Sequence, residues 1–142
     1  MKYLIIALVL IFSSCAEKYR EIAVYSNPDS VKVKLEISGE STSGGKAGFS
    51  LRFINTGERD LGRCKIKLND KYEHQLEGLF CITEDWEGKP QTSMIKTGES
   101  ATVIFGPNYD NYSLFGIKDD NFGLPEIIEL TCLDGKVIWK TR

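Results

Sequence analysis

The sequence predicts an all-β protein, folded as a single antiparallel β-sandwich of about seven strands. Two observations predict this class. Apolar and polar residues alternate along several short segments, as in strands that bury one face, and turn-forming Gly, Asn, Asp and Ser residues separate these segments. No segment has a convincing amphipathic helical pattern. Because each half-buried strand needs a second layer over its apolar face, the segments predict two packed sheets.

The first predicted strands lie in the first half of the chain. Residues 31–37 alternate strictly, with aliphatic side chains on one face and charged side chains on the other. A loop rich in Ser and Gly is expected over residues 39–48. Residues 49–53 alternate again and end at Asn55-Thr56-Gly57, a turn sequence because Asn and Gly adopt positive φ at little cost.

Two hairpins are predicted further along the chain. Inward apolar positions alternate with basic ones over residues 64–68, and Asn69-Asp70 then turns the chain into a strand over residues 72–76. An irregular stretch follows. The second hairpin turns at Asp134-Gly135. The remaining strands are expected over residues 101–105, 128–132 and 137–139.

A signal peptide is predicted over residues 1–14. Lys2 supplies a positive charge, residues 4–12 are uninterrupted apolar residues, and Ser13-Ser14 provide the small side chains that a signal peptidase accepts. The apolar run is much shorter than the roughly 20 residues that a helix needs to cross a bilayer core. Export is therefore expected, and a transmembrane helix is not.

The segment Phe12-Ser13-Ser14-Cys15 resembles the lipobox of bacterial lipoproteins, with Phe12 where Leu is usual. The resemblance implies that Cys15 is acylated and becomes the new amino terminus, and more than one acyl chain gives stable membrane anchoring. It implies a location in the cell envelope, facing the periplasm or the cell surface, and Ala16 favours the outer over the inner membrane. The alternative is ordinary cleavage near Ser14, with Cys15 as a free or disulfide-bonded thiol.

The rest of the chain is predicted to form one domain. Residues 15–30 read as the lipidated cysteine and a polar tether, with a short strand at residues 22–25, and residues 31–142 as the sandwich domain. The formal net charge of −2 gives no support to nucleic-acid binding. The expected partners are a membrane, through the lipid anchor, and an envelope protein or glycan.

Three cysteines remain if Cys15 carries lipid. They are Cys64, Cys81 and Cys132, and an oxidising compartment would allow one disulfide among them and one leftover thiol. Three pairings are open. No two of these cysteines have the short CxxC spacing of redox or zinc sites, so a structural disulfide is favoured over a metal site.

The body of the chain resembles the immunoglobulin-like and fibronectin-III-like domains of bacterial envelope proteins. The resemblance is carried by the segments 53–57 (Phe-Ile-Asn-Thr-Gly), 64–69 (Cys-Lys-Ile-Lys-Leu-Asn) and 97–100 (Thr-Gly-Glu-Ser). It implies an immunoglobulin-like β-sandwich and a role in adhesion, assembly or scaffolding. The antibody pattern of paired cysteines around a central Trp is absent, and the resemblance assigns no functional residue.

Catalytic patterns are weak in this sequence. His74 is the only histidine, and no GxSxG nucleophile elbow accompanies it. Paired-carboxylate hydrolysis stays an alternative, although neighbouring acids in loops are usually only solvated. These acids are Glu84, Asp85, Glu87, Asp119 and Asp120. Residues 118–123 lack the spaced oxygen ligands of a calcium loop. We therefore expect no catalytic residue, no metal site and no cofactor.

Two surfaces are candidate binding sites. In the loop over residues 107–122, aromatic rings stand among Asn and Asp residues, which suits recognition of sugars or peptides. The candidates there are Tyr109, Tyr112 and Phe115. Alternatively, these rings close the end of the sandwich. The second surface is the basic row of Arg63, Lys65 and Lys67, for which a solvated or protective sheet face is the alternative.

The sequence thus predicts a non-catalytic, membrane-anchored envelope lipoprotein that acts as a binding, scaffold or accessory module. The alternative is a small inhibitor or ligand carrier of the envelope that works through an exposed aromatic loop. An enzyme whose acidic residues meet only in the fold is a third class.

Overall fold

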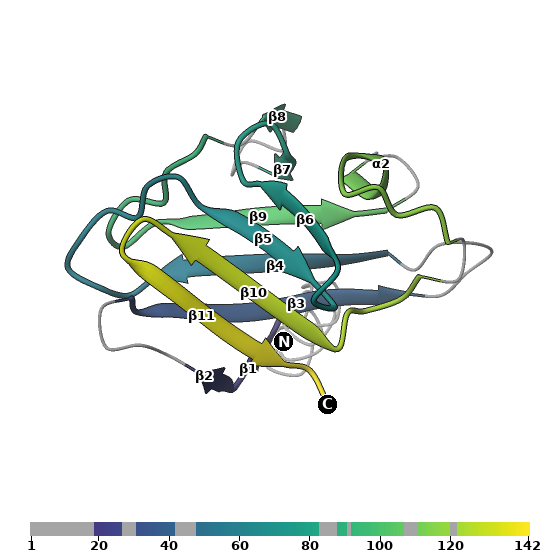
Figure 1. The fold of residues 1–142 in the computed structure, drawn as a ribbon, viewed down its shortest axis with the longest axis horizontal. Helices are drawn as coiled ribbons and strands as arrows, with labels where there is room; N and C mark the ends of the chain where they lie inside the picture. The colour runs from purple at the N-terminus through teal and green to yellow at the C-terminus, as the bar shows by residue number, and fades with distance from the viewer. Residues whose placement is uncertain are drawn as a thin grey trace, which may run out of the picture.

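The computed structural model describes residues 19–26, 31–41, 48–82, 88–90, 92–106, 111–119 and 122–142. These residues form two antiparallel β-sheets that pack face to face (Figure 1). The predicted all-β sandwich is therefore confirmed.

The first sheet has six strands in the order β1-β3-β4-β9-β7-β8. Its strands are β1 (Arg20–Ile22), β3 (Val33–Ser41), β4 (Gly48–Asn55), β7 (Phe80–Ile82), β8 (Gly88–Pro90) and β9 (Ser100–Phe105). The longest pairing joins β3 to β4, with Leu35 opposite Phe53. The register shifts near Gly39, which has a φ of 74° that a glycine adopts without steric cost.

The second sheet has five strands in the order β2-β11-β10-β5-β6. Its strands are β2 (Val24–Ser26), β5 (Lys65–Leu68), β6 (Tyr72–Gln75), β10 (Ile127–Cys132) and β11 (Gly135–Lys140). The chain passes from the first sheet to the second at Ala23, between β1 and β2. The two short strands that come before β3 in the sequence therefore belong to different sheets, β1 to the first and β2 to the second.

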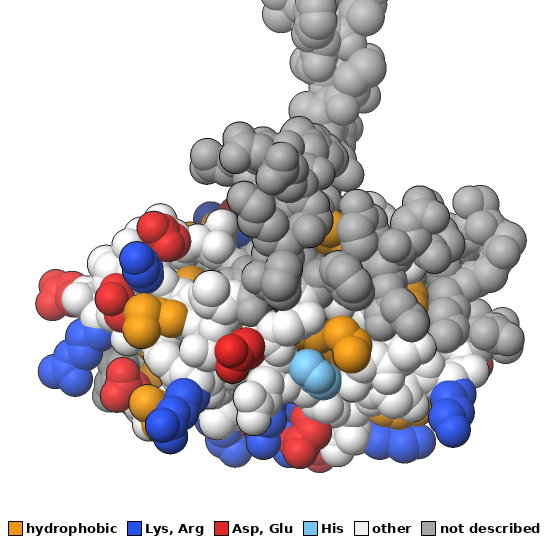
Figure 2. Space-filling model, turned by 90° about the horizontal axis from the view of Figure 1, so that it is seen from above, with side chains coloured by type: hydrophobic (Ala, Val, Ile, Leu, Met, Phe, Trp, Pro, Cys, Tyr) orange, Lys and Arg blue, Asp and Glu red, His pale blue; other side chains and the backbone are white. Residues whose placement is uncertain are grey.

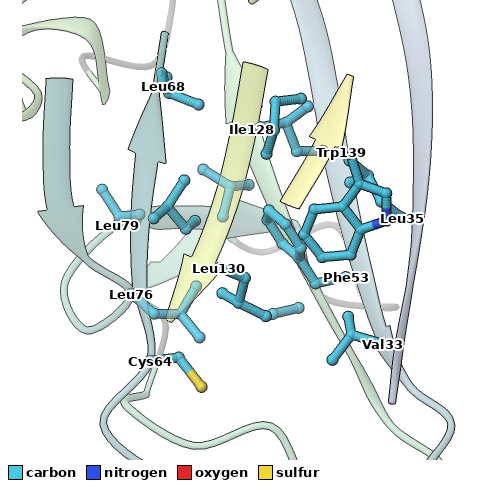
Figure 3. Packing of buried hydrophobic residues seen from close by; sticks show 14 of the residues in the cluster. Val33, Leu35, Phe53, Cys64, Leu68, Leu76, Leu79, Ile128, Leu130 and Trp139 are labelled. Carbon is cyan, nitrogen blue, oxygen red and sulfur yellow. The ribbon is translucent and has the colours of Figure 1, made fainter. Parts of the chain in front are cut away.

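The core lies between the two sheets and is built from the inward-facing residues of each strand. Trp139 on β11 and Phe53 on β4 are both fully buried, and their ring centroids lie 5.8 Å apart (Figure 3). Cys64, Ile66 and Leu68 are buried as the alternation predicts. Aliphatic and aromatic side chains from both layers thus fill the space that the sequence pattern predicts.

Both predicted hairpins are present. Asn69 and Asp70 turn β5 into β6 with φ values of 52° and 57°, and the Asn69 side chain accepts a hydrogen bond from the Glu126 backbone at 2.8 Å. The β10–β11 hairpin turns at Gly135, where φ is 145°. Asn and Gly are favoured at such positions because they adopt positive φ at the lowest cost.

Asn55 has a different role from the one that its turn sequence suggests. Its buried side chain donates hydrogen bonds to the backbone oxygens of Arg59 at 2.7 Å and Ile95 at 3.0 Å, and accepts one from the Gly57 backbone at 3.0 Å. Asn55 does not adopt positive φ. It stabilises this connection by satisfying buried backbone groups, not by left-handed backbone geometry.

The described residues contain eleven strands, more than the seven or so expected, and one helical turn, α2 (Asn111–Leu114). Two of the additional strands, β1 and β2, lie within residues 15–30, which the sequence suggested as a tether, and Ile22 is buried in the core. The short strand expected at residues 22–25 overlaps the end of β1 and most of β2, but strands of three residues are too short for alternation to give their bounds. The folded body therefore begins at or before Arg20, earlier than residue 31.

Candidate functional site

The aromatic loop contributes its described rings to the core. Tyr112 and Phe115 are only 3% and 5% exposed. Their ring centroids lie 5.3 Å and 5.5 Å from that of Phe105 on β9. Burial raises the pKa of Tyr112 to about 12. Tyr109 lies outside the described residues. Binding through this loop stays a prediction, and the described rings close one end of the sandwich.

Local structure explains why these rings turn inward. The Asn111 side chain is buried and donates a hydrogen bond to the Ile104 carbonyl at 2.6 Å, which fixes α2 against β9. The Phe115 N–H bonds the Asn111 carbonyl at 3.1 Å, and Gly116 then ends the turn with a φ of 73°. This single turn places Tyr112 and Phe115 on the side that faces the core.

The basic row occupies the outward side of β5, as the sequence predicts. Lys65 and Lys67 are half-buried, whereas Arg63, which precedes the strand, is exposed and has an unusual φ of 49°. The buried Cys64 and Ile66 alternate with these residues and point into the core. Lys65 and Lys67 are therefore part of a sheet face, and Arg63 lies just before the strand that carries them.

Neighbouring strands add acidic and neutral residues to this row. In the register, Lys67 lies between Glu73 on β6 and Glu129 on β10. The Lys65 ammonium lies 3.3 Å from the Glu73 carboxylate. The Thr131 hydroxyl donates to Glu129 at 3.0 Å. The sequence alone could not bring these residues together, because cross-strand register depends on tertiary pairing.

The same face continues over β11. Ile138 lies opposite Glu129, and Lys136 lies opposite Thr131. Ile127 and Ile138 are half-buried, so aliphatic surface lies between the charged rows. At its far margin the Lys140 ammonium lies 3.8 Å above the ring of Tyr25, a side chain that is 62% exposed. We call the outward side of β5, β10 and β11 the outer face.

Charges of both signs alternate on this surface. In the view from above, which does not look directly onto the outer face, Figure 2 likewise shows acidic and basic side chains interspersed on the described surface. Exposed cross-strand ion pairs of this kind contribute at most about 1 kcal/mol each to stability. The arrangement therefore adds little to folding, but it presents a defined charge pattern to a partner.

The described residues offer weak support for catalysis. His74 on β6 has its Nδ1 atom 2.6 Å from the Gln75 carbonyl, and its ring packs 5.8 Å from that of Phe115. No group of three or more His, Cys, Asp or Glu side chains in the described ranges could hold a metal ion. Asp119 is exposed, and its backbone carbonyl accepts a hydrogen bond from the Phe122 N–H at 3.2 Å. Glu84, Asp85, Glu87 and Asp120 lie outside the described residues.

Two of the three cysteines meet in the fold. The Sγ atoms of Cys64 and Cys132 lie 2.7 Å apart, and both side chains are buried free thiols. Cys81 lies on β7 in the other sheet, opposite Val103 of β9, and its side chain is outside the described part of the chain.

Comparison with protein-family models, with curated proteins and with solved structures found no match. Within the described ranges, no helix has the length and apolar character required to cross a membrane.

Proposed function

We propose that this protein is a non-catalytic binding module of the cell envelope, anchored to a membrane by lipid on Cys15, and that it docks an envelope protein on the outer face. The observation that carries the proposal is the composition of that face. Every outward position of β5, β10 and β11 is half-buried or exposed, and charges of both signs surround Ile127 and Ile138.

This composition suits a protein partner. Protein interfaces combine an apolar centre with a polar rim, and complementary charges set the orientation of the two partners. A nucleic acid would need a surface of one positive sign, whereas Glu73 and Glu129 flank Lys67 on this face. The alternative, a small inhibitor or ligand carrier acting through the aromatic loop, has less support because the rings of Tyr112 and Phe115 are buried.

The leader sequence supports the proposed lipid anchor. Because the fold begins soon after Cys15, the anchor would also restrict the distance between the sandwich and the membrane. Strand β1 begins at Arg20, only five residues after Cys15. Even a fully extended chain of this length spans no more than about 18 Å. A lipid on Cys15 would therefore hold the sandwich close to the membrane and limit which partners can reach the outer face.

We also propose that the sandwich is immunoglobulin-like, and the strand order supports this. The order β3-β4-β9-β7 corresponds to strands A, B, E and D of that fold. The order β11-β10-β5-β6 corresponds to G, F, C and the additional C′ strand. An experimentally determined structure tests this assignment, which fails if these eight strands pair in another order.

Site-specific crosslinking in cells tests the docking proposal. A photoreactive residue replaces Lys67 on the outer face or, in a matched variant, Leu114 in the aromatic loop, which is 41% exposed. We expect one dominant protein adduct from position 67 and none from position 114, because only the first lies in the proposed interface. The second variant controls for expression and exposure.

One outcome would contradict docking on the outer face, and a separate outcome would contradict the lipid anchor. An adduct from position 114 alone would move the binding site to the aromatic loop and favour the inhibitor or carrier function. The lipid anchor is tested in the same cells: Cys15→Ser should release the protein from the membrane fraction, and retention of this variant would disprove anchoring through Cys15.

A further inference from the structure

Cys64 and Cys132 occupy facing positions on neighbouring strands. Cys64 directly precedes β5, and Cys132 is the last residue of β10. These strands pair antiparallel with Thr131 opposite Lys65, so the next step of the register places the two cysteines opposite each other. Both side chains point to the core side of the sheet (Cys64 is labelled in Figure 3).

Backbone hydrogen bonds show that this is a closely spaced pair. The Cys64 N–H donates to the Ser93 carbonyl at 3.2 Å, and the Cys64 carbonyl accepts from the Leu76 N–H at 2.8 Å. Neither group bonds Cys132, so the two cysteines form a non-hydrogen-bonded pair, in which Cα atoms lie about 4.5 Å apart. That spacing lies within the range of about 4.4–6.8 Å that disulfides span.

We infer that Cys64 and Cys132 form a cross-strand disulfide that fastens β5 to β10 when the protein is oxidised. The step is two successive thiol–disulfide exchanges with a protein or small-molecule disulfide. One thiolate attacks the external disulfide and releases its first thiol. The second cysteine then displaces the second thiol, so the protein loses two protons and two electrons and the oxidant becomes two thiols.

The surroundings determine when the bond forms. The contact with Cys64 and burial raise the pKa of the Cys132 thiol, so Cys132 supplies little thiolate in the folded protein at neutral pH, and both side chains are buried. A surface hollow of about 580 Å³, lined by both cysteines together with Arg63, Ser93 and Leu133, leads to the pair. We therefore expect slow oxidation of the folded protein and fast oxidation during folding, before the thiols are buried.

The placement of Cys81 makes this pairing specific. Its strand β7 belongs to the six-stranded sheet, whereas Cys64 and Cys132 belong to the five-stranded sheet. A bond from Cys81 to either partner would have to join the two sheets, whereas the Sγ atoms of Cys64 and Cys132 already lie 2.7 Å apart on neighbouring strands. The proposal thus leaves Cys81 outside the bond, together with Cys15 in protein that carries no lipid.

Peptide mapping of the purified full chain tests the pairing without any variant. The protein is unfolded, refolded with glutathione disulfide, blocked with an alkylating reagent and digested without reduction. We expect a linked peptide that contains Cys64 and Cys132, and alkylation of Cys81. Because the assay uses purified protein, its result is independent of the membrane anchor and of the docking proposal.

Matched variants extend the test. Cys81→Ser should keep the linked peptide, whereas Cys64→Ser should lose it. Oxidation of the wild-type chain should raise the Tm by on the order of 10 °C, because the bond closes a long loop in the unfolded state. The proposal is overturned if Cys64 and Cys132 are both fully alkylated after oxidative refolding, or if the linked peptide contains Cys81.

Discussion

The outward-facing sides of the two sheets differ in how many of their side chains are buried. One of these sides is the outer face of β5, β10 and β11. On the six-stranded sheet, Ser38, Ser50 and Ile104 form a cross-strand row of buried side chains. On β5, β10 and β11, no outward position is buried. Among the described residues, the outward side of β5, β10 and β11 therefore offers more accessible surface to a partner than the buried row of the six-stranded sheet does.

The charged residues follow the same division. On the six-stranded sheet, Glu36 lies 3.4 Å from both Lys34 and Arg52, and Arg52 lies 3.6 Å above the ring of Tyr19. The hydrogen bond to Glu36 and the charge of Glu21 raise the pKa of Lys34. On the other face, Lys65 pairs with Glu73, whereas Lys67 has no ion pair with any described residue. Its charge remains available for contacts with another molecule.

The largest expected effect is a loss of stability, and it distinguishes residues that point into the core from residues on the outer face. Trp139→Ala removes a fully buried ring that packs on Phe53, and it should lower the free energy of unfolding by about 3–5 kcal/mol. Its neighbour Ile138 points outward, so Ile138→Ala should cost less than about 1 kcal/mol. Urea unfolding measures both, and equal losses would contradict the assignment of inner and outer positions.

A negative charge introduced on the outward-facing side of each sheet tests the difference in burial between the two sides. Ser50→Asp puts a carboxylate into the buried row and should cost about 2 kcal/mol or more. Thr131→Asp lies between Lys65 and Lys136 but loses the hydrogen bond to Glu129 and adds a carboxylate beside it, so it should cost no more than about 1 kcal/mol. If thermal unfolding shows that both variants are equally stable, the six-stranded face is not covered at Ser50.

These contrasts show what the sequence could and could not predict. Alternation identified Cys64, Ile66 and Leu68 as inward residues, because a half-buried strand imposes a period of two. It could not indicate that Glu73 and Glu129 flank Lys67, because register is set by pairing between distant segments.

The aromatic loop and the beginning of the fold show the same limit. The composition of residues 107–122 is equally compatible with exposed and with buried rings, and the Asn111 bond to β9 turns Tyr112 inward. Strands β1 and β2 are too short to show a period, so the sequence predicts one short strand over residues 22–25, and the pairing with β3 and β11 shows two.

A smaller effect is expected at alkaline pH, and it tests whether Tyr112 belongs to the inner layer. Burial raises the pKa of Tyr112 in the folded protein to about 12, above its ordinary value of about 10. The unfolded chain therefore loses this proton first. The stabilisation is complete below about pH 10 and is lost as the pH rises towards 12.

Tyr112→Phe should make the loss of stability in this pH window shallower, as measured by urea unfolding at several pH values. Tyr25→Phe is the matched control, because Tyr25 is largely exposed, and it should follow the wild-type curve. A wild-type slope for Tyr112→Phe would show that its ring is not held in the core.

Lysine labelling tests the central claim most directly, because each lysine is compared with itself in two preparations, so that differences in exposure between half-buried and exposed lysines cancel. The protein is treated with an amine-reactive reagent in native envelope membranes and again after purification, and the extent of modification is compared by mass spectrometry. The face lysines are Lys65, Lys67 and Lys136, and the control lysines are Lys32, Lys96 and Lys118. Docking on the outer face predicts that only the first group is protected in membranes, whereas equal labelling of both groups in the two preparations would contradict it.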